Sequence, residues 1–211
     1  MSEYPIRACG DDLLSIAVPT AGIAQQLALD LRNSGDWLEA VGGIDSVVVQ
    51  FNVAQLSIAD AIKALQEITP AGEVEEQAVA PSIQIPVHYG GEFGPDLDAL
   101  CVSLSLTRDE FIALHCRNEY CVDMLGFTPG FAYIGGLDSR FDVARLANPR
   151  QRVEAGSIGV AGGRSGIYAL AGPGGWPIIG RTELVLFNAN TDEPFLLLPG
   201  MRVRFVPVHK S

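Results

Sequence analysis

The apolar residues of the first eighty positions change their spacing several times, as expected for alternating strands and helices. Short apolar runs at Tyr4–Ala8 and Leu13–Val18, and a β-branched run at Val47–Val53, predict three strands. Apolar residues recur at helical spacing after Thr20, which can cap a helix that ends near Gly35. A serine and an aspartate three residues apart predict the start of a second helix after the third strand. These elements predict a small α+β domain.

The second part of the chain has a different pattern. Ser82–Tyr89 predicts a strand, and the pair Thr107 and Glu110 has the spacing of a capping box for a helix over Phe111–Arg117. After that helix, short apolar runs are separated by glycine and proline, which is typical of a barrel or sandwich. The predicted strands of this region are Tyr120–Leu125, Ser157–Val160, Gly166–Leu170, Leu184–Phe187 and Arg202–Val206.

Charge supports a division into two domains. The 211 residues carry a net charge of −11. Residues 1–80 hold 12 acidic and three basic residues, a net charge of −9, whereas residues 81–211 hold 13 acidic and 11 basic residues, a net charge of −2. The segment Thr69–Pro81 is bounded by prolines and poor in large apolar residues, which is typical of a linker. We therefore expect an α+β domain over residues 1–75, a linker over 76–82 and a mainly β domain over 83–211.

Composition also excludes several classes of function. An acidic chain is a poor partner for nucleic acid, because binding phosphates needs a basic surface. No apolar stretch reaches the roughly 18 residues of a membrane span, and the first residues lack the layout of a signal peptide, so we expect a cytoplasmic protein. The four cysteines and three histidines are scattered without the spacing of metal ligands, which predicts no metal site.

Local catalytic motifs are not found either. Gly159–Ser165 resembles a phosphate-binding loop, but its spacing is one residue short and arginine stands in the place of lysine. The residues that follow predict a strand, whereas a phosphate loop leads into a helix. Gly163–Gly166 is one residue too short for a nucleophile elbow. The sequence therefore indicates no enzyme that is active by itself.

Two glycine-rich segments, Gly126–Leu137 and Ala171–Thr182, contain most of the remaining candidates for a binding site. Glycine permits close backbone approaches, so aromatic side chains among these glycines could wall a pocket with exposed backbone amides. The alternative is that these segments form tight barrel corners whose aromatic residues fill the core. The aromatic residues are Phe127, Phe131, Tyr133 and Trp176.

A series of motifs in fixed order resembles one known family. It comprises Ile85–Gly91 (IPVHYGG), Gly94–Leu97 (GPDL), Leu114–His115 with Glu119–Tyr120, Leu125–Phe131 (LGFTPGF), Arg152–Gly159 (RVEAGSIG), Pro173–Thr182 (PGGWPIIGRT) and Asp192–Phe205 (DEPFLLLPGMRVRF). This series is similar to the family that contains the B subunit of the prokaryotic 5-oxoprolinase, the kinase inhibitor KipI and allophanate hydrolase subunit 1. The resemblance covers nearly all of residues 83–207.

The resemblance implies an α+β fold, with a small N-terminal α+β domain and a cyclophilin-like β-barrel. It implies a cytoplasmic protein that helps to open 5-oxoproline to glutamate with ATP, together with the C and A subunits of the same 5-oxoprolinase, and that is inactive alone. A KipI-like inhibitor of a sensor histidine kinase, and a subunit of a urea carboxylase or allophanate hydrolase, remain as alternatives. The sequence departs from the family pattern at Ala132 and over Arg164–Ala169, and a fixed charge at Arg164 would alter anion recognition.

Residue chemistry gives the candidates for the individual roles. Arginine binds carboxylate and phosphate through two parallel hydrogen bonds, which makes Arg181 the first choice for an anion contact and Arg164 the second. His115 could move a proton near neutral pH, with Glu119 as its partner or as a base. The alternative is that His115 is a hydrogen-bonded core residue at a helix end. His88 is expected to be a turn residue rather than a catalyst.

Overall fold

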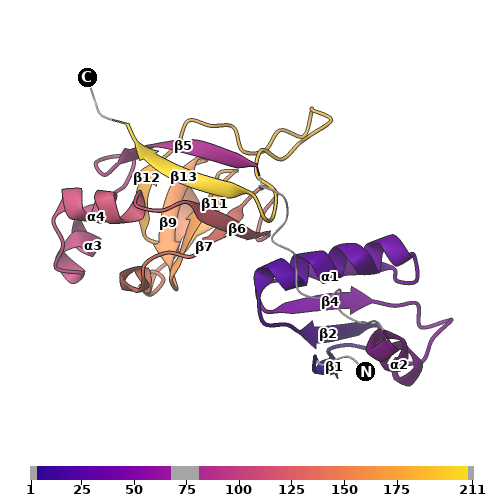
Figure 1. Cartoon of the computed structure of the whole chain (residues 1–211). Coiled ribbons are helices and arrows are strands. Elements are labelled where there is room, and N and C mark those ends of the chain that lie inside the picture. Colours follow the sequence, from indigo (N-terminus) through magenta and orange to yellow (C-terminus); the bar gives the residue numbers. More distant parts are fainter. Residues whose placement is uncertain (1–3, 68–80, 209–211) are drawn as a thin grey trace. The chain divides into compact units, whose positions relative to one another are not determined.

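The chain divides into two compact units, Met1–Val79 and Ala80–Ser211 (Figure 1). The computed structural model describes residues 4–67 and 81–208. Most of the linker expected at 76–82 therefore lies outside the described residues, and its last residue, Ser82, is already part of a strand. Within the described residues, no helix has the length and apolar character needed to cross a membrane.

The first unit is a four-stranded antiparallel sheet with the strand order β1-β2-β4-β3. Alternate residues of β2, β3 and β4 are buried, so one face of the sheet forms a core together with the helices. The elements are β1 (Ile6–Ala8), β2 (Leu13–Ala17), α1 (Ala21–Ser34), β3 (Glu39–Gly42), β4 (Ser46–Gln50) and α2 (Ile58–Glu67).

Both helices of this unit begin where the sequence predicted. The Thr20 side chain accepts a hydrogen bond from the Ile23 amide at 3.3 Å, and α1 ends at Gly35, whose φ of +75° is the left-handed conformation that glycine tolerates best. At α2 the Ser57 hydroxyl accepts from the Asp60 amide at 3.2 Å. Strand β3 was not predicted, because its few apolar residues lie between glycines.

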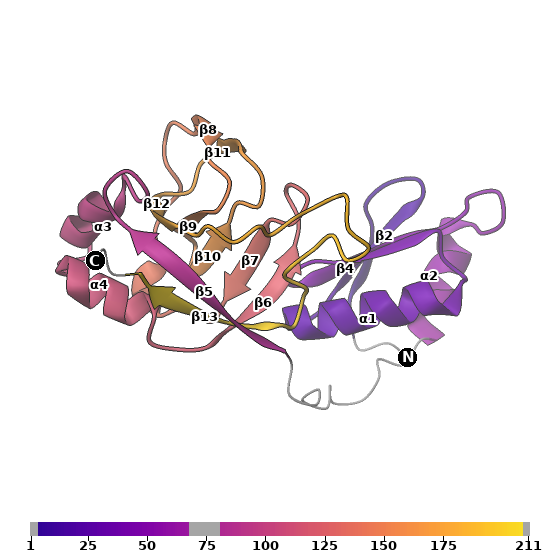
Figure 2. The same ribbon diagram turned by 90° about the horizontal axis from the view of Figure 1, so that it is seen from above.

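The second unit is a closed seven-stranded barrel with the order β10-β7-β6-β13-β5-β12-β9 (Figure 2). All neighbouring strands are antiparallel except β5 and β13, which run parallel. Strands β8 and β11 form a separate pair beside the barrel. The elements are β5 (Ser82–Tyr89), α3 (Leu97–Ser103), α4 (Arg108–His115), β6 (Tyr120–Leu125), β7 (Ala132–Gly135), the 3-10 turn η1 (Ser139–Phe141), β8 (Arg150–Val153), β9 (Ser157–Ala161), β10 (Arg164–Ile167), β11 (Gly172–Gly174), β12 (Ile178–Arg181) and β13 (Arg202–Pro207).

The predicted α+β fold with a C-terminal barrel is confirmed, with corrections to individual elements. Leu184–Phe187 is not a strand; it makes only an isolated bridge, between Phe187 and Phe195. The strand expected over Gly166–Leu170 begins earlier, at Arg164. The helix expected from Phe111 begins at Arg108, directly after the complete capping box formed by Thr107 and Glu110.

The barrel has two apolar clusters on opposite sides of its wall. Inside, large side chains from every strand and from α3 and α4 fill the barrel, among them Ile85, Phe111, Ile158 and Phe205. Outside, a smaller cluster contains Phe131, Val153, Tyr168 and Ile178. The predicted aromatic residues belong to this outer cluster.

Candidate functional site

Glycines in two adjacent strands create the space for the outer aromatic cluster. A Cβ atom placed on Gly166 in β10 would lie 2.7 Å from Phe131 and 2.8 Å from Trp176, and one placed on Gly159 in β9 would lie 2.9 Å from Trp176. All three distances are shorter than any tolerable contact, so the rings lie directly on the backbone of the wall. Phe131 is the centre of the cluster and contacts Tyr133, Tyr168 and Trp176 edge to face.

The aromatic residues therefore do not fill the barrel interior. Phe131 and Trp176 are buried outside it, and Tyr133 is half-buried. Among the four aromatic residues predicted from the sequence, only Phe127 is exposed, with 62% of its surface accessible. Neither alternative described this arrangement, in which a buried aromatic layer supports one exposed ring.

Phe127 has a strained backbone. Its φ of +65° lies in the left-handed region, which is uncommon for a bulky residue. The conformation turns the ring outward, where its edge contacts Phe131 at 5.5 Å and Tyr168 at 6.5 Å between ring centroids. The neighbouring Thr128 hydroxyl is buried without a hydrogen-bond partner in the described chain. Strain of this kind is concentrated at functional sites.

Arg164 is already paired within the barrel wall. Its guanidinium Nε lies 3.2 Å from a carboxylate oxygen of Asp123 on β6, and both side chains are largely buried. Burial raises the pKa of Asp123, and the bond from Arg164 only partly offsets this rise. An anion at Arg164 would have to displace Asp123, so the structure weakens the second of our two anion candidates.

His115 lies inside the barrel at the end of α4 and has no exposed surface. Its Nδ1 is 2.7 Å from the Tyr89 hydroxyl and its Nε2 is 3.2 Å from the Ser165 hydroxyl, while the ring stacks on Phe205 at 4.3 Å. Burial lowers the pKa of His115 from 6.5 to about 3, so the imidazole is neutral near pH 7. This environment favours the interpretation of His115 as a core residue.

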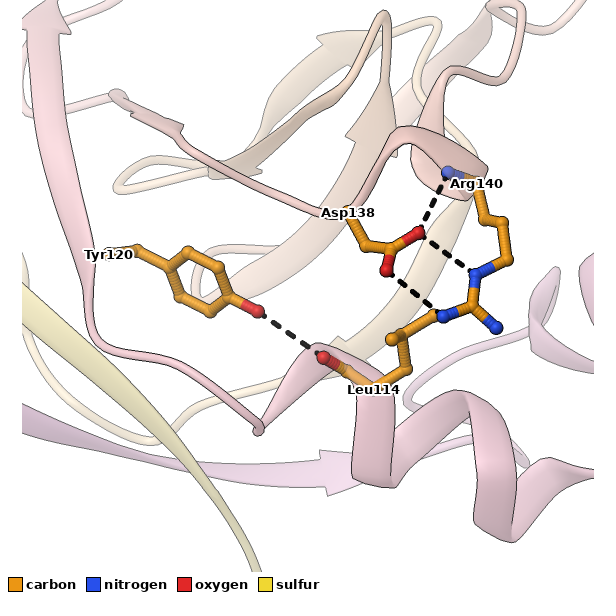
Figure 3. Close-up of polar contacts among 4 residues, drawn as sticks. All are labelled: Leu114, Tyr120, Asp138 and Arg140. Atoms are coloured by element: carbon orange, nitrogen blue, oxygen red, sulfur yellow. Dashed lines mark hydrogen bonds and ion pairs between the residues drawn. The ribbon is translucent and has the colours of Figure 1, made fainter.

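Contacts around the end of α4 fix this position. The Tyr120 hydroxyl donates to the Leu114 carbonyl at 3.3 Å, next to His115 in the chain (Figure 3). In the same view Asp138 accepts from the backbone amide and the guanidinium of Arg140. This carboxylate caps the short turn that buries Phe141, whose ring also touches His115.

Glu119 is separate from His115. Its carboxylate accepts a hydrogen bond from the Ser82 hydroxyl at the start of β5. The hydrogen-bond partners of the His115 ring among the described residues are Tyr89 and Ser165. The structure thus does not bring these two predicted catalytic residues together.

Arg181 lies at the end of β12 on the outer wall. Its guanidinium carbon is 4.4 Å from the centre of the Phe93 ring, a cation–π contact. The residue opposite Arg181 on β5 is His88, which is part of a strand and not of a turn as expected. Sequence reasoning overlooked His88 and Phe93 as a possible site because only strand pairing brings them to Arg181.

The segment that resembled a phosphate-binding loop is a hairpin turn. Strand β9 ends at Ala161, Gly162 and Gly163 have φ values of +54° and +70°, and β10 begins at Arg164. Two successive left-handed residues are typical of the tightest hairpin turns. No helix follows, so this segment lacks the helix N-terminus of a phosphate loop. In the described part of the chain, no group of three or more histidine, cysteine and acidic residues is placed to hold a metal ion.

Comparison with known proteins identifies the family. Residues 5–197 match the model of the carboxyltransferase domain, subdomain C and D. The chain belongs to this family. Two informative relatives are proteins named as the B subunit of 5-oxoprolinase. The chain is 42% identical over 185 residues to the one from Escherichia coli O157:H7, covering 86% of this chain and 83% of that protein. It is 36% identical over 193 residues to the one from Haemophilus influenzae, covering 89% and 90%.

Solved structures agree with the family. PH0987 from Pyrococcus horikoshii, described as a conserved uncharacterized protein, is 38% identical with a TM-score of 0.59, and the match covers 97% of both chains. TTHA0988 is 28% identical with a TM-score of 0.77; the match covers 98% of this family member but only 41% of the TTHA0988 chain. The urea amidolyase of Kluyveromyces lactis shares the fold at 18% identity and a TM-score of 0.75.

Proposed function

We infer that this chain is the B subunit of a 5-oxoprolinase, an enzyme complex that depends on ATP. The observation that carries this inference is the identity of 42%, 43% and 36% to three proteins of that name. The alignments with the proteins of E. coli and H. influenzae extend over both units of the chain. The family resemblance predicted from the sequence is confirmed by the same matches and by the carboxyltransferase-domain model.

The partners follow from the name of the relatives. A protein named as one lettered part of an enzyme works with further parts, and we propose that these are the A and C subunits of the same complex. TTHA0988 supports the idea of an adjoining partner, because the region that matches this chain is only 41% of a longer polypeptide. The chain alone is expected to be inactive.

The chemistry explains why ATP is needed. A lactam amide is a poor electrophile, and transfer of the terminal phosphoryl group of ATP to the lactam oxygen makes the ring carbon reactive. Water then adds to this carbon, the ring C–N bond breaks, and phosphate leaves with the oxygen that carried it. The products are glutamate, ADP and phosphate. Because the glycine-rich turn at Gly162 and Gly163 does not have the geometry of a phosphate loop, we place ATP on a partner protein of the complex.

Within this chain, the accessible candidates are Arg181 and Phe127. Arg181 is the proposed contact for an anionic group of the substrate, and Phe127 is the proposed exposed contact of the aromatic cluster formed with Phe131, Tyr133, Tyr168 and Trp176. His115, Glu119 and Arg164 are each engaged by neighbours within the barrel unit, so we assign to them the positioning of strands and helix ends.

The test is reconstitution. Purified chain mixed with its A and C partners should hydrolyse ATP at a rate that rises when 5-oxoproline is added, and it should release glutamate. Omitting this chain should abolish the stimulation. If the three proteins together show no 5-oxoproline-dependent hydrolysis, the proposed function is wrong; inhibition of a sensor histidine kinase by the chain alone would then favour the KipI-like alternative.

A further inference from the structure

We propose that Arg181 and His88, supported by Phe93, form a binding site for a carboxylate on the outer wall of the barrel, and that Glu183 occupies this site when no ligand is bound. The inference rests on the proposed function for the identity of the ligand, which would be the carboxylate of 5-oxoproline.

The three residues are held together by the sheet and by a loop fastened to it. His88 and Arg181 are direct partners on the antiparallel strands β5 and β12, so their side chains project from the same face, about 5 Å apart at Cβ. Phe93 follows β5 in a loop that is bonded to β12: the Gly90 amide donates to the Ile179 carbonyl at 3.0 Å, and the Asp96 carboxylate accepts from the Ile178 amide at 2.6 Å.

Phe93 connects the two basic groups. The Arg181 guanidinium lies over its ring at 4.4 Å, and the His88 ring centre is 5.2 Å from the same ring. An arginine that rests with its flat face on an aromatic ring keeps its N–H groups, which point outward in the guanidinium plane, available to a ligand. These donors match the two oxygens of a carboxylate.

The neighbouring acids leave the charge of Arg181 uncompensated. Among the described residues, the ion pairs within 4 Å do not include Arg181. The nearest acid on the β8 side is Glu154, and its carboxylate is bonded to Arg152 at 2.7 Å. The positive charge of Arg181 is thus available for an anion from solution.

Glu183 shows where such an anion would lie. Its carboxylate oxygen is 3.7 Å from His88 Nε2, beyond hydrogen-bond range, and 87% of its side chain is exposed. A weak and highly exposed contact of this kind contributes little free energy, so a ligand carboxylate held by Arg181 as well would displace it. Glu183 therefore acts as a built-in competitor, which lowers affinity and suppresses binding of stray anions.

The decisive experiment measures KM for 5-oxoproline and for ATP in the reconstituted complex. Arg181→Gln should raise KM for 5-oxoproline roughly tenfold or more and leave KM for ATP almost unchanged, because a charge-assisted double hydrogen bond is lost. His88→Gln should raise the same KM several-fold, and Glu183→Gln should lower it. Arg204→Gln removes the same charge from the exposed face of β13 and serves as the matched control.

Binding to the full chain alone separates this inference from the proposed function. The imidazole signals of His88 in NMR spectra should shift when 5-oxoproline or acetate is added, and the shift should disappear in Arg181→Gln, whose thermal unfolding is compared with that of the parent to confirm its fold. Unchanged KM values in Arg181→Gln and His88→Gln within an active complex would overturn the site while leaving the function intact. A response of His88 to inorganic phosphate but not to either carboxylate would also overturn it.

Discussion

The imidazole of His115 has a defined protonation state because its neighbours allow only one pattern of hydrogen bonds. The Ser165 hydroxyl donates to the Gly159 carbonyl at 3.2 Å, so the His115 Nε2 must donate to the Ser165 oxygen. The His115 Nδ1 is then an acceptor for the Tyr89 hydroxyl at 2.7 Å. A second proton on the ring would break this chain of donors and acceptors, which adds to the effect of burial.

This burial predicts a loss of stability in acid. The pKa of His115 is about 3 in the folded chain and about 6.5 when unfolded, so between these values only the unfolded chain binds the proton. The free energy of unfolding should therefore fall as the pH drops below 6.5, by up to about 1.4 kcal/mol per pH unit from this residue. His115→Gln should be less stable than the parent at pH 7, and the gap should narrow toward pH 5 in urea titrations. A gap that stays constant with pH would contradict the prediction.

The strained backbone of Phe127 makes a second prediction at the scale of one residue. Replacement by glycine removes the cost of the left-handed conformation, whereas alanine keeps that cost and also loses the ring contacts. Phe127→Gly should therefore be more stable than Phe127→Ala by about 1 kcal/mol in urea unfolding. Equal stability of the two variants would show that the strain is absent. In the reconstituted complex both variants should lose activity, because the exposed ring is gone.

At the scale of elements, the outer aromatic cluster depends on glycines within strands β9 and β10. A methyl group at position 166 would overlap Phe131 and Trp176, so Gly166→Ala should lower the free energy of unfolding by about 1–3 kcal/mol and change the fluorescence of Trp176. Gly172→Ala is the matched control, because a Cβ at Gly172 has no atom within 4 Å. Similar effects of both substitutions would mean that the cluster does not rest on the strand backbone.

Elements with local signals could be predicted from the sequence, and those defined by distant partners could not. The capping side chains Thr20 and Thr107 act on amides three residues away, so the starts of α1 and α4 were visible. Strands β7 and β12 are short and flanked or interrupted by glycine, and they become strands only because neighbouring strands pair with them. The same glycines that concealed these strands make room for the aromatic cluster.

The candidate site follows the same rule. The sequence identified Arg181 and the aromatic residues by their chemistry. The pairing of Arg164 with Asp123, 41 residues away, and the contact of His115 with Ser165, 50 residues away, depend on barrel closure. The choice between a catalytic and a core His115 therefore required the structure.

At the scale of the whole molecule, the two units have separate apolar cores and different charges. One core comprises residues of the first unit only, from Leu14 to Leu65, and the clusters of the barrel begin at Ile85. We therefore expect two unfolding transitions in calorimetry. Leu31→Ala should lower the midpoint of one and Phe111→Ala that of the other, since each removes a fully buried side chain worth about 2–5 kcal/mol. Val102→Ala, at a residue that is 81% exposed, should move neither. A single transition that both core substitutions shift would contradict independent cores.

The parallel pairing of β5 with β13 has a consequence for synthesis in the cell. Ser82 lies beside Arg202 and Val87 beside Pro207, so the barrel is closed by its first and last strands. During translation, β5 emerges early but lacks this neighbour until roughly 120 further residues have left the ribosome. Its open edge is meanwhile free to pair with other nascent chains, and contacts of such high sequence separation form slowly. Barrel closure is therefore the step at which a chaperone would most affect the yield of native protein.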